Sequence, residues 1–193
     1  ARAAARLAFV TRPRYQAAMS SRIPTFAAIE TVRAYGDYAG AGGLRLASGR
    51  LLRSGHHAKA TDADLQRLAD LGMAVVVDLR HPAERGYQPS RRLPGWDGLV
   101  IESDIDNDEK GEPPHVTFLK TTDLSAESVT AYMTDAYRRI PFEPRHLDLF
   151  TRYFDALAQT EGAVLIHCAA GKDRTGLLAA LTQATPTTPA APA

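Results

Sequence analysis

The chain has 193 residues, 45% of them hydrophobic and 23% charged, which suffices for one globular domain with a substantial core. Its formal net charge of +1 argues against nucleic acid or an anionic membrane surface as a partner. No stretch is long and apolar enough to predict a membrane span. The single cysteine excludes a disulfide within the chain, which favours a reducing compartment, so we expect a cytoplasmic protein, with secretion as the alternative. The oligomeric state is not predicted.

Residues 1–18 differ in composition from the rest of the chain. They are rich in alanine, carry Arg2, Arg6, Arg12 and Arg14, and contain no acidic residue. They also lack the continuous apolar core of a secretory signal. We expect residues 1–18 to be a disordered or artefactual extension that precedes a domain spanning 19–184.

The first half of the domain shows alternating strand and helix signals. Glycines at 40–43 suggest a hairpin turn, and 51–53 is the returning strand. A capping box at 61–64 begins a helix that Gly72 ends. The apolar strand 74–78 follows directly. This order predicts an α/β fold with a central sheet flanked by helices.

The second half continues the same alternation. Residues 99–101 form a short apolar strand, and 163–166 form another that is expected to be buried. Two helices lie between them, the second starting at Pro144. We expect their apolar stripes to be core faces; the stripes are Val129, Met133, Ala136 and Ile140, and then Leu147, Phe150, Phe154 and Leu157.

The most informative segment is His167-Cys168-Ala169-Ala170-Gly171-Lys172-Asp173-Arg174-Thr175-Gly176, which contains the only cysteine. It lies between the strand 163–166 and a helix containing 177–181. A loop between a strand and a helix N-terminus places backbone N–H groups and the positive end of the helix dipole beside an anion. The same field favours a thiolate at Cys168.

The spacing of this segment fits phosphate chemistry. The five residues between Cys168 and Arg174 form an arch whose N–H groups point inward, and the Arg174 guanidinium closes the ring with a bidentate fork. Gly171 permits the backbone angles of the arch, and Thr175 places a hydroxyl near the sulfur. We therefore predict Cys168 as a nucleophile toward phosphorus. The predicted phosphate-binding residues are Ala169, Ala170, Gly171, Lys172, Asp173 and Thr175.

Two other interpretations of this segment are weaker. A lone cysteine after an apolar strand is usually an inert core residue, but the polar residues that follow Cys168 do not suit a core. A Walker-type nucleotide loop fails because Lys172 is followed by Asp173 in place of Ser or Thr.

The segment resembles the signature of the protein tyrosine phosphatase superfamily. The fuller string H-C-x-x-G-K-D-R-T-G is similar to a bacterial and fungal branch that acts on phosphoproteins and phosphoinositides. The blocks 49–55, 76–80 and 131–137 also resemble that branch, so the likeness runs from about Ile23 to Leu181. The resemblance implies a cysteine-dependent phosphomonoester hydrolase with tyrosine or dual specificity, a thiophosphate intermediate and no cofactor.

Such a reaction needs a general acid to protonate the leaving oxygen. Asp104, Asp106 and Asp108 follow the strand 99–101, and the carboxyl end of that strand is expected at the sheet edge that also holds the Cys168 loop. Asp104 aligns best with the acid of the resembled branch. Asp106, Asp173 and Asp78 remain alternatives, and a solvated loop is the non-functional interpretation of the acidic run.

Several charged residues near these segments have two possible roles. Lys172 either adds positive charge for a second phosphate or is a solvent-facing lysine. Arg53 and Arg80 either reach the phosphate or, as we expect, form structural ion pairs. His167 is expected to hydrogen-bond the loop, as the resemblance implies.

No metal site is predicted. The acidic run does not have the spacing of a calcium loop, since Gly111 and His115 stand at the wrong positions. The other histidines show no ligand spacing; they are His56, His57, His81, His115 and His146.

The C-terminal residues 185–193 are rich in Pro, Thr and Ala, and we expect them to be disordered. The resembled phosphatases continue with further helices, so the resemblance predicts a C-terminally truncated domain. We expect an exposed apolar side formed by Leu177, Leu178 and Leu181. A catalytically silent phosphate-binding protein is therefore the alternative to an active phosphatase, besides a phosphoinositide phosphatase. Rhodanese or arsenate-reductase chemistry is a weaker third possibility.

Overall fold

The computed structural model describes residues 25–36, 46, 49–105 and 114–185. In this part of the chain a five-stranded sheet has the order β1-β2-β5-β3-β4. The strands are β1 (Arg33–Ala34), β2 (Leu51–Ser54), β3 (Met73–Asp78), β4 (Leu99–Ile101) and β5 (Ala163–His167). β1 is antiparallel to β2, and the other neighbours are parallel. The predicted α/β fold with a central sheet is confirmed.

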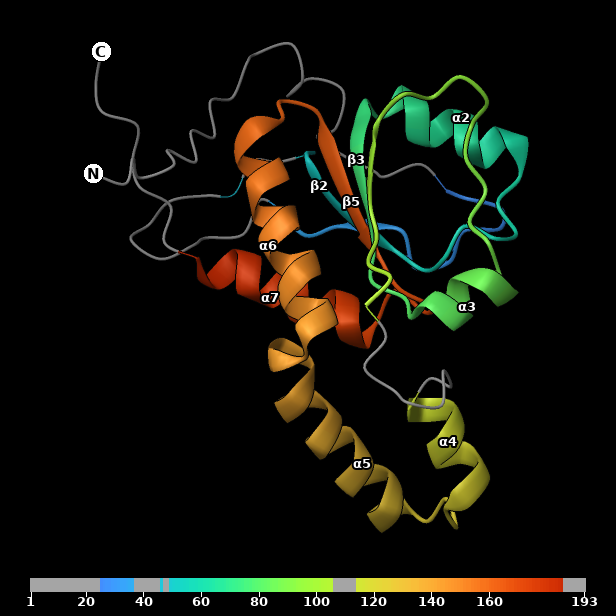
Figure 1. Cartoon of the computed structure of the whole chain (residues 1–193). Coiled ribbons are helices and arrows are strands. Elements are labelled where there is room, and N and C mark those ends of the chain that lie inside the picture. The colour runs from blue at the N-terminus through green and yellow to red at the C-terminus, as the bar shows by residue number, and fades with distance from the viewer. Residues whose placement is uncertain (1–24, 37–45, 47–48, 106–113, 186–193) are drawn as a thin grey trace, which may run out of the picture.

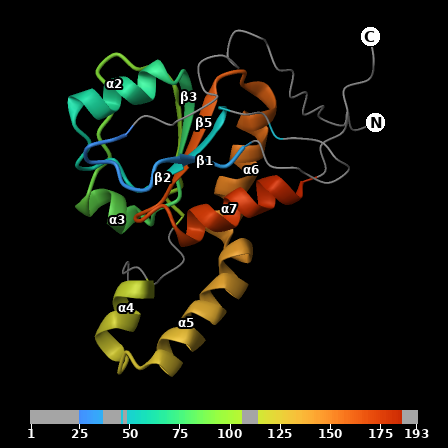
Figure 2. The ribbon, with the colours of Figure 1, turned by 180° about the vertical axis from the view of Figure 1, so that it is seen from behind.

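Helices cover both faces of the sheet (Figure 1). In that view α6 and α7 lie on one face and α2 lies on the other, while α4 and α5 project beyond one end of the sheet. Figure 2 shows the same arrangement from behind. The helices are α2 (Asp62–Asp70), α3 (Pro82–Tyr87), α4 (Pro114–Thr121), α5 (Ala126–Arg139), α6 (Pro144–Gln159) and α7 (Asp173–Ala184), with a 3₁₀ turn at Ile140–Phe142.

The two layers follow from the alternation of side chains along each strand. In β5, Val164 and Ile166 pack in the core cluster that contains residues of α6 and α7. Ala163 and Leu165 pack in the other cluster, with α2. Because both faces are covered, the strand is a continuous apolar run, as is usual for parallel sheets.

The local signals around α2 are confirmed. Thr61 and Asp64 form the reciprocal capping box, in which the Thr61 hydroxyl accepts from the Asp64 amide at 3.1 Å. The Asp64 carboxylate also accepts from the amides of Ala27 and Ala28 at 2.8 and 3.0 Å, which attaches the preceding segment to the helix. Gly72, with φ of 69°, follows the helix and leads into β3.

The expectation that the stripe on α5 faces the core is wrong. No residue of α5 is buried, and Val129 is 38% exposed. Met133, Ala136 and Ile140 instead line a cavity that also contains Cys168. An amphipathic stripe shows that a helix has an apolar face without showing what covers it, and here the face is a wall of the cavity.

The prediction that the apolar stripe on α6 faces the core is correct in part. Phe150 and Leu157 are buried, and Phe154 packs against the same cluster. Leu147 is 48% exposed, so its assignment to the core is wrong. It lies in the first turn of α6, at the end where α5 leads away from the sheet.

The expected exposed apolar side of α7 is also largely wrong. Leu178 is fully buried, Leu177 is partly buried against the core, and Leu181 is 37% exposed. The reason is that α7 packs back onto β2 and β5, which supply the cover for its inner face.

Several predictions fall on residues outside the described ranges. These are the extension at 1–18, the hairpin turn at 40–43 and nearly all of the tail at 185–193. The domain boundaries at 19 and 184 therefore stay predictions.

The burial of α7 leads to the first testable prediction. Leu178→Ala removes a side chain with no exposed surface and should lower the free energy of unfolding by about 2–5 kcal/mol. Leu181→Ala, one turn further along the same helix and partly exposed, should cost less than about 1 kcal/mol. Urea unfolding measures both values, and equal losses would contradict this packing of α7.

Candidate active site

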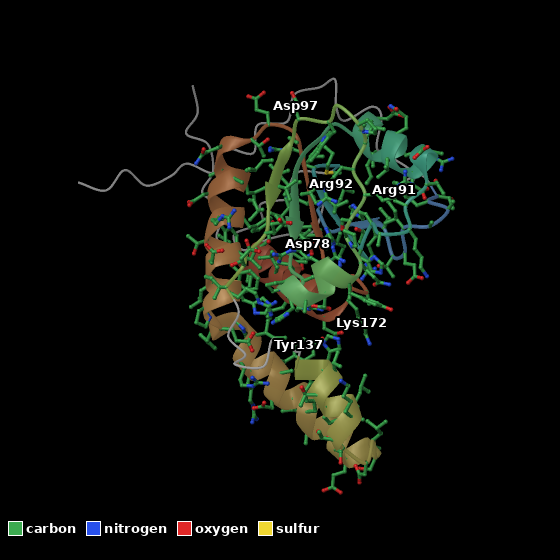
Figure 3. All side chains as sticks on the ribbon, turned by 45° about the vertical axis from the view of Figure 1, so that its right-hand side comes forward. Asp78, Arg91, Arg92, Asp97, Tyr137 and Lys172 are labelled. Atoms are coloured by element: carbon green, nitrogen blue, oxygen red, sulfur yellow. The ribbon has the colours of Figure 1, made fainter. Side chains whose placement is uncertain are left out.

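The parallel strands bring the predicted site residues to one edge of the sheet. β2, β3, β4 and β5 all run in the same direction, so their carboxyl ends meet there. Cys168 follows β5, and α7 begins five residues later at Asp173. Figure 3 shows Lys172 and Tyr137 at the end of the sheet from which α4 and α5 project, with Asp97 at the opposite end.

The carbonyl groups of the loop after Cys168 are bonded to donors outside the loop. The amide of His56 donates to the Ala169 carbonyl at 3.0 Å, and the Thr31 hydroxyl donates to the Ala170 carbonyl at 3.1 Å. Arg53 Nη2 donates to the carbonyls of Gly171 and Lys172 at 2.9 and 2.8 Å. With the carbonyls held outward, the amides of 169–172 have no acceptor among the described residues.

Arg53 therefore has a structural role, although its partners are carbonyls and not the carboxylates that we expected. It lies on β2, next to the strand that carries the loop, and its guanidinium bridges two successive residues of the loop. Successive loop amides that have no acceptor within the protein are typical of sites that bind an oxyanion.

Gly171 is required by the close packing of this loop. Its φ is 66°, a conformation that L side chains rarely adopt. A Cβ atom at this position would lie 2.3 Å from the carbonyl carbon and oxygen of Ser54, so no other residue fits without moving the loop or β2.

Arg174 is held by a carboxylate that the sequence analysis did not identify. Its Nη1 and Nη2 donate to the two oxygens of Glu84 at 2.6 and 2.8 Å, and Nη1 also donates to the Leu79 carbonyl at 3.3 Å. A guanidinium has five N–H donors in a planar fork. Nε and the second hydrogen of Nη2 remain without an acceptor in the described structure, and this edge of the fork is available for an anion.

Glu84 and Arg174 stabilise each other's charged forms. Burial by itself raises the pKa of Glu84, but the hydrogen bond and charge of Arg174 outweigh it and lower the pKa to about 2. Burial lowers the pKa of Arg174, and Glu84 more than compensates, so that pKa lies above its ordinary range. Glu84 belongs to the capping box that starts α3, where its carboxylate also accepts from the His81 amide at 2.7 Å.

His167 is a buried histidine directly before the loop. Burial lowers the pKa of His167 to about 4 against the opposing effect of Asp78, so the imidazole is neutral at pH 7. Its Nδ1 lies 3.4 Å from the Cys168 carbonyl oxygen, and its ring stacks on His57 with centroids 4.6 Å apart. This contact with the loop backbone agrees with the role that the resemblance implies for His167.

Asp78 and Arg80 form a buried ion pair beside His167. Arg80 Nη2 donates to Asp78 Oδ2 at 2.7 Å, and each side chain is 1% exposed. Burial raises the pKa of Asp78, but His167 and Arg80 together hold it well below its usual range. Arg80 is thus an ion-pair partner, and Asp78 carries no proton to donate at neutral pH.

Cys168 lies at a cavity of about 290 Å³. Cys168 is 3% exposed as a residue, and Arg174, Asp173 and the first residues of the loop line the same cavity. The opposite wall comes from α5 and the start of α6. The Thr175 hydroxyl is buried without a hydrogen-bond partner among the described residues, so its bond to the sulfur stays a prediction.

The structure separates Asp104 from this cavity. Arg85 Nη2 donates to Asp104 Oδ1 at 2.5 Å, and the Asp104 side chain is 91% exposed. It lines a second cavity of about 380 Å³ together with Asp78. Asp106 lies outside the described residues.

Lys172 and Asp173 lie on the rim of the loop. Lys172 is exposed, so both of its predicted roles stay open. The Tyr137 hydroxyl donates to Asp173 Oδ1 at 2.6 Å, and this bond raises the pKa of Tyr137 to about 12. Tyr137 thus links α5 directly to the loop that follows Cys168.

Within 25–36, 46, 49–105 and 114–185, no group of three His, Cys, Asp or Glu side chains is placed to hold a metal ion. No helix in the same ranges is long and apolar enough to cross a membrane.

Sequence reasoning missed Glu84 and Arg145 as cavity residues. The signal for Glu84 was the helix start His81-Pro82, with a glutamate at the third helical position. Arg145 follows the predicted helix start at Pro144, and nothing in the local sequence shows that its side chain is buried.

The chain matches the family described as "Tyrosine phosphatase family" over residues 24–186. It is 35% identical over 159 residues to the protein named "Putative tyrosine-protein phosphatase" of Cupriavidus necator, which covers 81% of this chain and 55% of that protein. It is 35% identical over 155 residues to the "Triple specificity protein phosphatase PtpB" of Mycobacterium tuberculosis, covering 70% of this chain and 55% of that protein.

A "Tyrosine-protein phosphatase" of Nostoc commune is more distant, at 27% identity over 136 residues, which cover 67% of this chain and 41% of that protein. The chain thus spans about half the length of the curated relatives it matches.

The pairing of Glu84 with Arg174 predicts a specific pH dependence of stability. Because the folded pKa of about 2 lies below the ordinary 4.5, the pair stabilises the fold above pH 4.5, and this contribution declines as the pH falls toward 2. Between pH 7 and pH 3 the wild type should lose about 2 kcal/mol more than Glu84→Gln.

Urea unfolding at several pH values measures this difference. Glu127→Gln, which changes an exposed carboxylate at the start of α5, is the matched control and should follow the wild type. Parallel curves for the wild type and Glu84→Gln would contradict the role given to the pair.

Proposed function

The chain belongs to the tyrosine phosphatase family, and from this premise we propose that it is a cysteine-dependent phosphatase. Its substrates are phosphotyrosine and, with dual specificity, other phosphate monoesters of proteins. The observation that carries the proposal is the loop after Cys168, whose carbonyls are bonded outward and whose amides are left free around the thiol.

The proposed reaction has two steps. The Cys168 thiolate attacks phosphorus, so that an S–P bond forms while the bond from phosphorus to the leaving oxygen breaks. The leaving oxygen takes a proton from a general acid. Water then attacks the phosphocysteine, its proton returns to the same carboxylate, and the S–P bond breaks to release phosphate and thiolate.

The loop supplies the charge stabilisation for both steps. The amides of 169–173 surround the phosphoryl oxygens, and the free edge of Arg174 binds two of them. Glu84 holds the opposite edge of the guanidinium, so that the fork is already oriented before substrate binds. Thr175 offers its buried hydroxyl to the sulfur as the leaving group of the second step.

We propose Asp104 as the general acid. It follows β4, whose carboxyl end lies at the same sheet edge as Cys168, and it aligns with the acid of the resembled branch. For catalysis its carboxylate must leave Arg85 and reach the cavity. Asp173 already lines the cavity and is the main alternative, whereas the ion pair with Arg80 weighs against Asp78.

Phosphoinositides are a second candidate substrate class. The exposed Lys172 at the rim of the loop adds a positive charge where a second phosphate would approach. The name of the Mycobacterium tuberculosis relative gives that protein three specificities, and the same breadth is part of this proposal. We place the enzyme in the cytoplasm, because a free thiol nucleophile has to stay reduced.

The first test of the function is substitution of the nucleophile. Cys168→Ser should abolish hydrolysis of p-nitrophenyl phosphate and of a phosphotyrosine peptide while still binding vanadate or phosphate, because the amides and Arg174 remain. Turnover in excess chelator should be unchanged in the wild type. Residual turnover near the wild-type rate in Cys168→Ser would refute the mechanism, and a wild type that binds phosphate without turning it over would favour the silent phosphate-binding alternative.

The second test identifies the acid through its dependence on the leaving group. Asp104→Asn should lower kcat for phenyl phosphate by about 10²-fold or more, and far less for p-nitrophenyl phosphate, whose leaving group needs no proton. The same kinetics for Asp106→Asn and Asp173→Asn serve as comparison. If one of those variants shows the selective loss and Asp104→Asn does not, the acid is reassigned and the role of Cys168 is unaffected.

A further inference from the structure

Arg145 is a buried cation at the cavity for which the proposed reaction has no use. The residue is 5% exposed and lines the same cavity as Cys168 and Arg174. Its Nη1 is buried without a hydrogen-bond partner among the described residues. A buried guanidinium that lacks an acceptor costs free energy, so its presence calls for a ligand or a function.

The other charges at the cavity are already paired. Glu84 is bonded to Arg174 through both of its oxygens. Glu143 contacts His146 Nδ1 at 3.0 Å and Arg139 Nη1 at 3.6 Å, and Asp173 accepts from Tyr137. Arg145 forms no ion pair within the described part of the chain, although two other arginines of the same cavity do.

The position of Arg145 on its helix strengthens this point. It lies in the first turn of α6, which contains no acidic residue, and the N-cap residue Glu143 makes no side-chain cap because its carboxylate contacts His146 and Arg139. The N-terminus of a helix carries partial positive charge and favours anions, so a cation at this position is unfavourable. Burial, together with the nearby charge of Arg174, lowers the pKa of Arg145 from its ordinary value, although the charges of Glu143 and Glu84 act in the opposite direction. An anion beside Arg145 would offset the cost of burying the guanidinium, its repulsion from Arg174 and its unfavourable position at a helix N-terminus.

We propose that Arg145 forms a second anion subsite in the cavity, beside the loop that binds the reacting phosphate. The preferred substrate is then an aryl phosphate that carries a second anionic group, a carboxylate or another phosphate, close to its ring. The aryl group contacts the wall formed by Met133, Ala136 and Ile140. This inference rests on the proposed function for the reacting phosphate and adds the residue that selects the substrate.

The kinetic test compares substrates that differ only in the second anion. Relative to phenyl phosphate, 3-carboxyphenyl phosphate and resorcinol bisphosphate should show kcat/KM at least tenfold higher in the wild type. In Arg145→Met the ratio of kcat/KM for a doubly anionic substrate to kcat/KM for phenyl phosphate should fall to about 1, and at most to about 2. The ratio divides out any loss of folded enzyme, and the two anionic substrates distinguish a carboxylate from a phosphate as the second group.

Arg139→Met is the matched control. It removes another guanidinium from the same cavity, but one that is paired with Asp135 at 2.7 Å and with Glu143. It should retain the preference for the second anion. A ratio that falls equally in both variants would assign the preference to general positive charge and overturn the subsite, as would a ratio that is unchanged in Arg145→Met. Arg145→Gln replaces Arg145→Met if the latter does not fold.

A binding experiment separates this inference from the proposed function. In Cys168→Ser, which needs no turnover, calorimetry should show that benzene-1,3-disulfonate binds at least tenfold more tightly than benzenesulfonate, and Arg145→Met in that background should remove the difference. If the wild type hydrolyses no phosphate ester but this difference is present, the proposed function fails and the subsite stands. Equal affinities for the two sulfonates would overturn the subsite even if hydrolysis is fast.

Discussion

The site depends on the outward attachment of the carbonyls in the loop after Cys168. A loop can direct several amides at one anion only if the opposite sides of those peptide groups find donors elsewhere, because a buried carbonyl without a partner is costly. Here the donors come from segments far away in the sequence, Thr31, Arg53 and the amide of His56. β2 and β5 are hydrogen-bonded neighbours, so the register of the sheet places Arg53 beside the loop. The geometry of the proposed anion site is therefore a consequence of the strand order.

Buried ion pairs then fix the orientation of the charged groups around the loop. Glu84 occupies one edge of the Arg174 fork and leaves the other edge toward the cavity. Asp78 and Arg80 compensate each other behind the loop, where His167 remains neutral. Buried pairs of this kind add little net stability, since desolvation offsets much of their attraction. These ion pairs act by orienting charged groups. An anion that binds at the loop would find the Arg174 guanidinium already positioned, so little reorganisation would be needed.

Local chemistry in the sequence was enough to predict much of this arrangement. The strand, loop and helix around Cys168 and the capping box of α2 depend on residues within a few positions of each other, and both are present. Glu84 was missed because its link to Arg174 spans 90 positions and only the tertiary structure creates it. The stripe on α5 was misassigned for a related reason. Periodicity shows that Met133 and Ala136 share a face, whereas the direction in which the helix leaves the sheet decides that this face borders a cavity.

The cavity is lined by both apolar and charged residues, and this difference links the fold to the proposed choice of substrate. Met133 and Ala136 of α5 form an apolar part of its wall, while the start of α6 presents Arg145 and His146 at a helix N-terminus. Glu143 is the N-cap of α6, but its carboxylate contacts His146 and Arg139 and does not cap the helix. Arg145 Nη1 nevertheless has no hydrogen-bond partner among the described residues, so its burial costs stability that a bound anion would restore. Local violations of this kind concentrate at functional sites, and Arg145 occurs within the same cavity as the thiol.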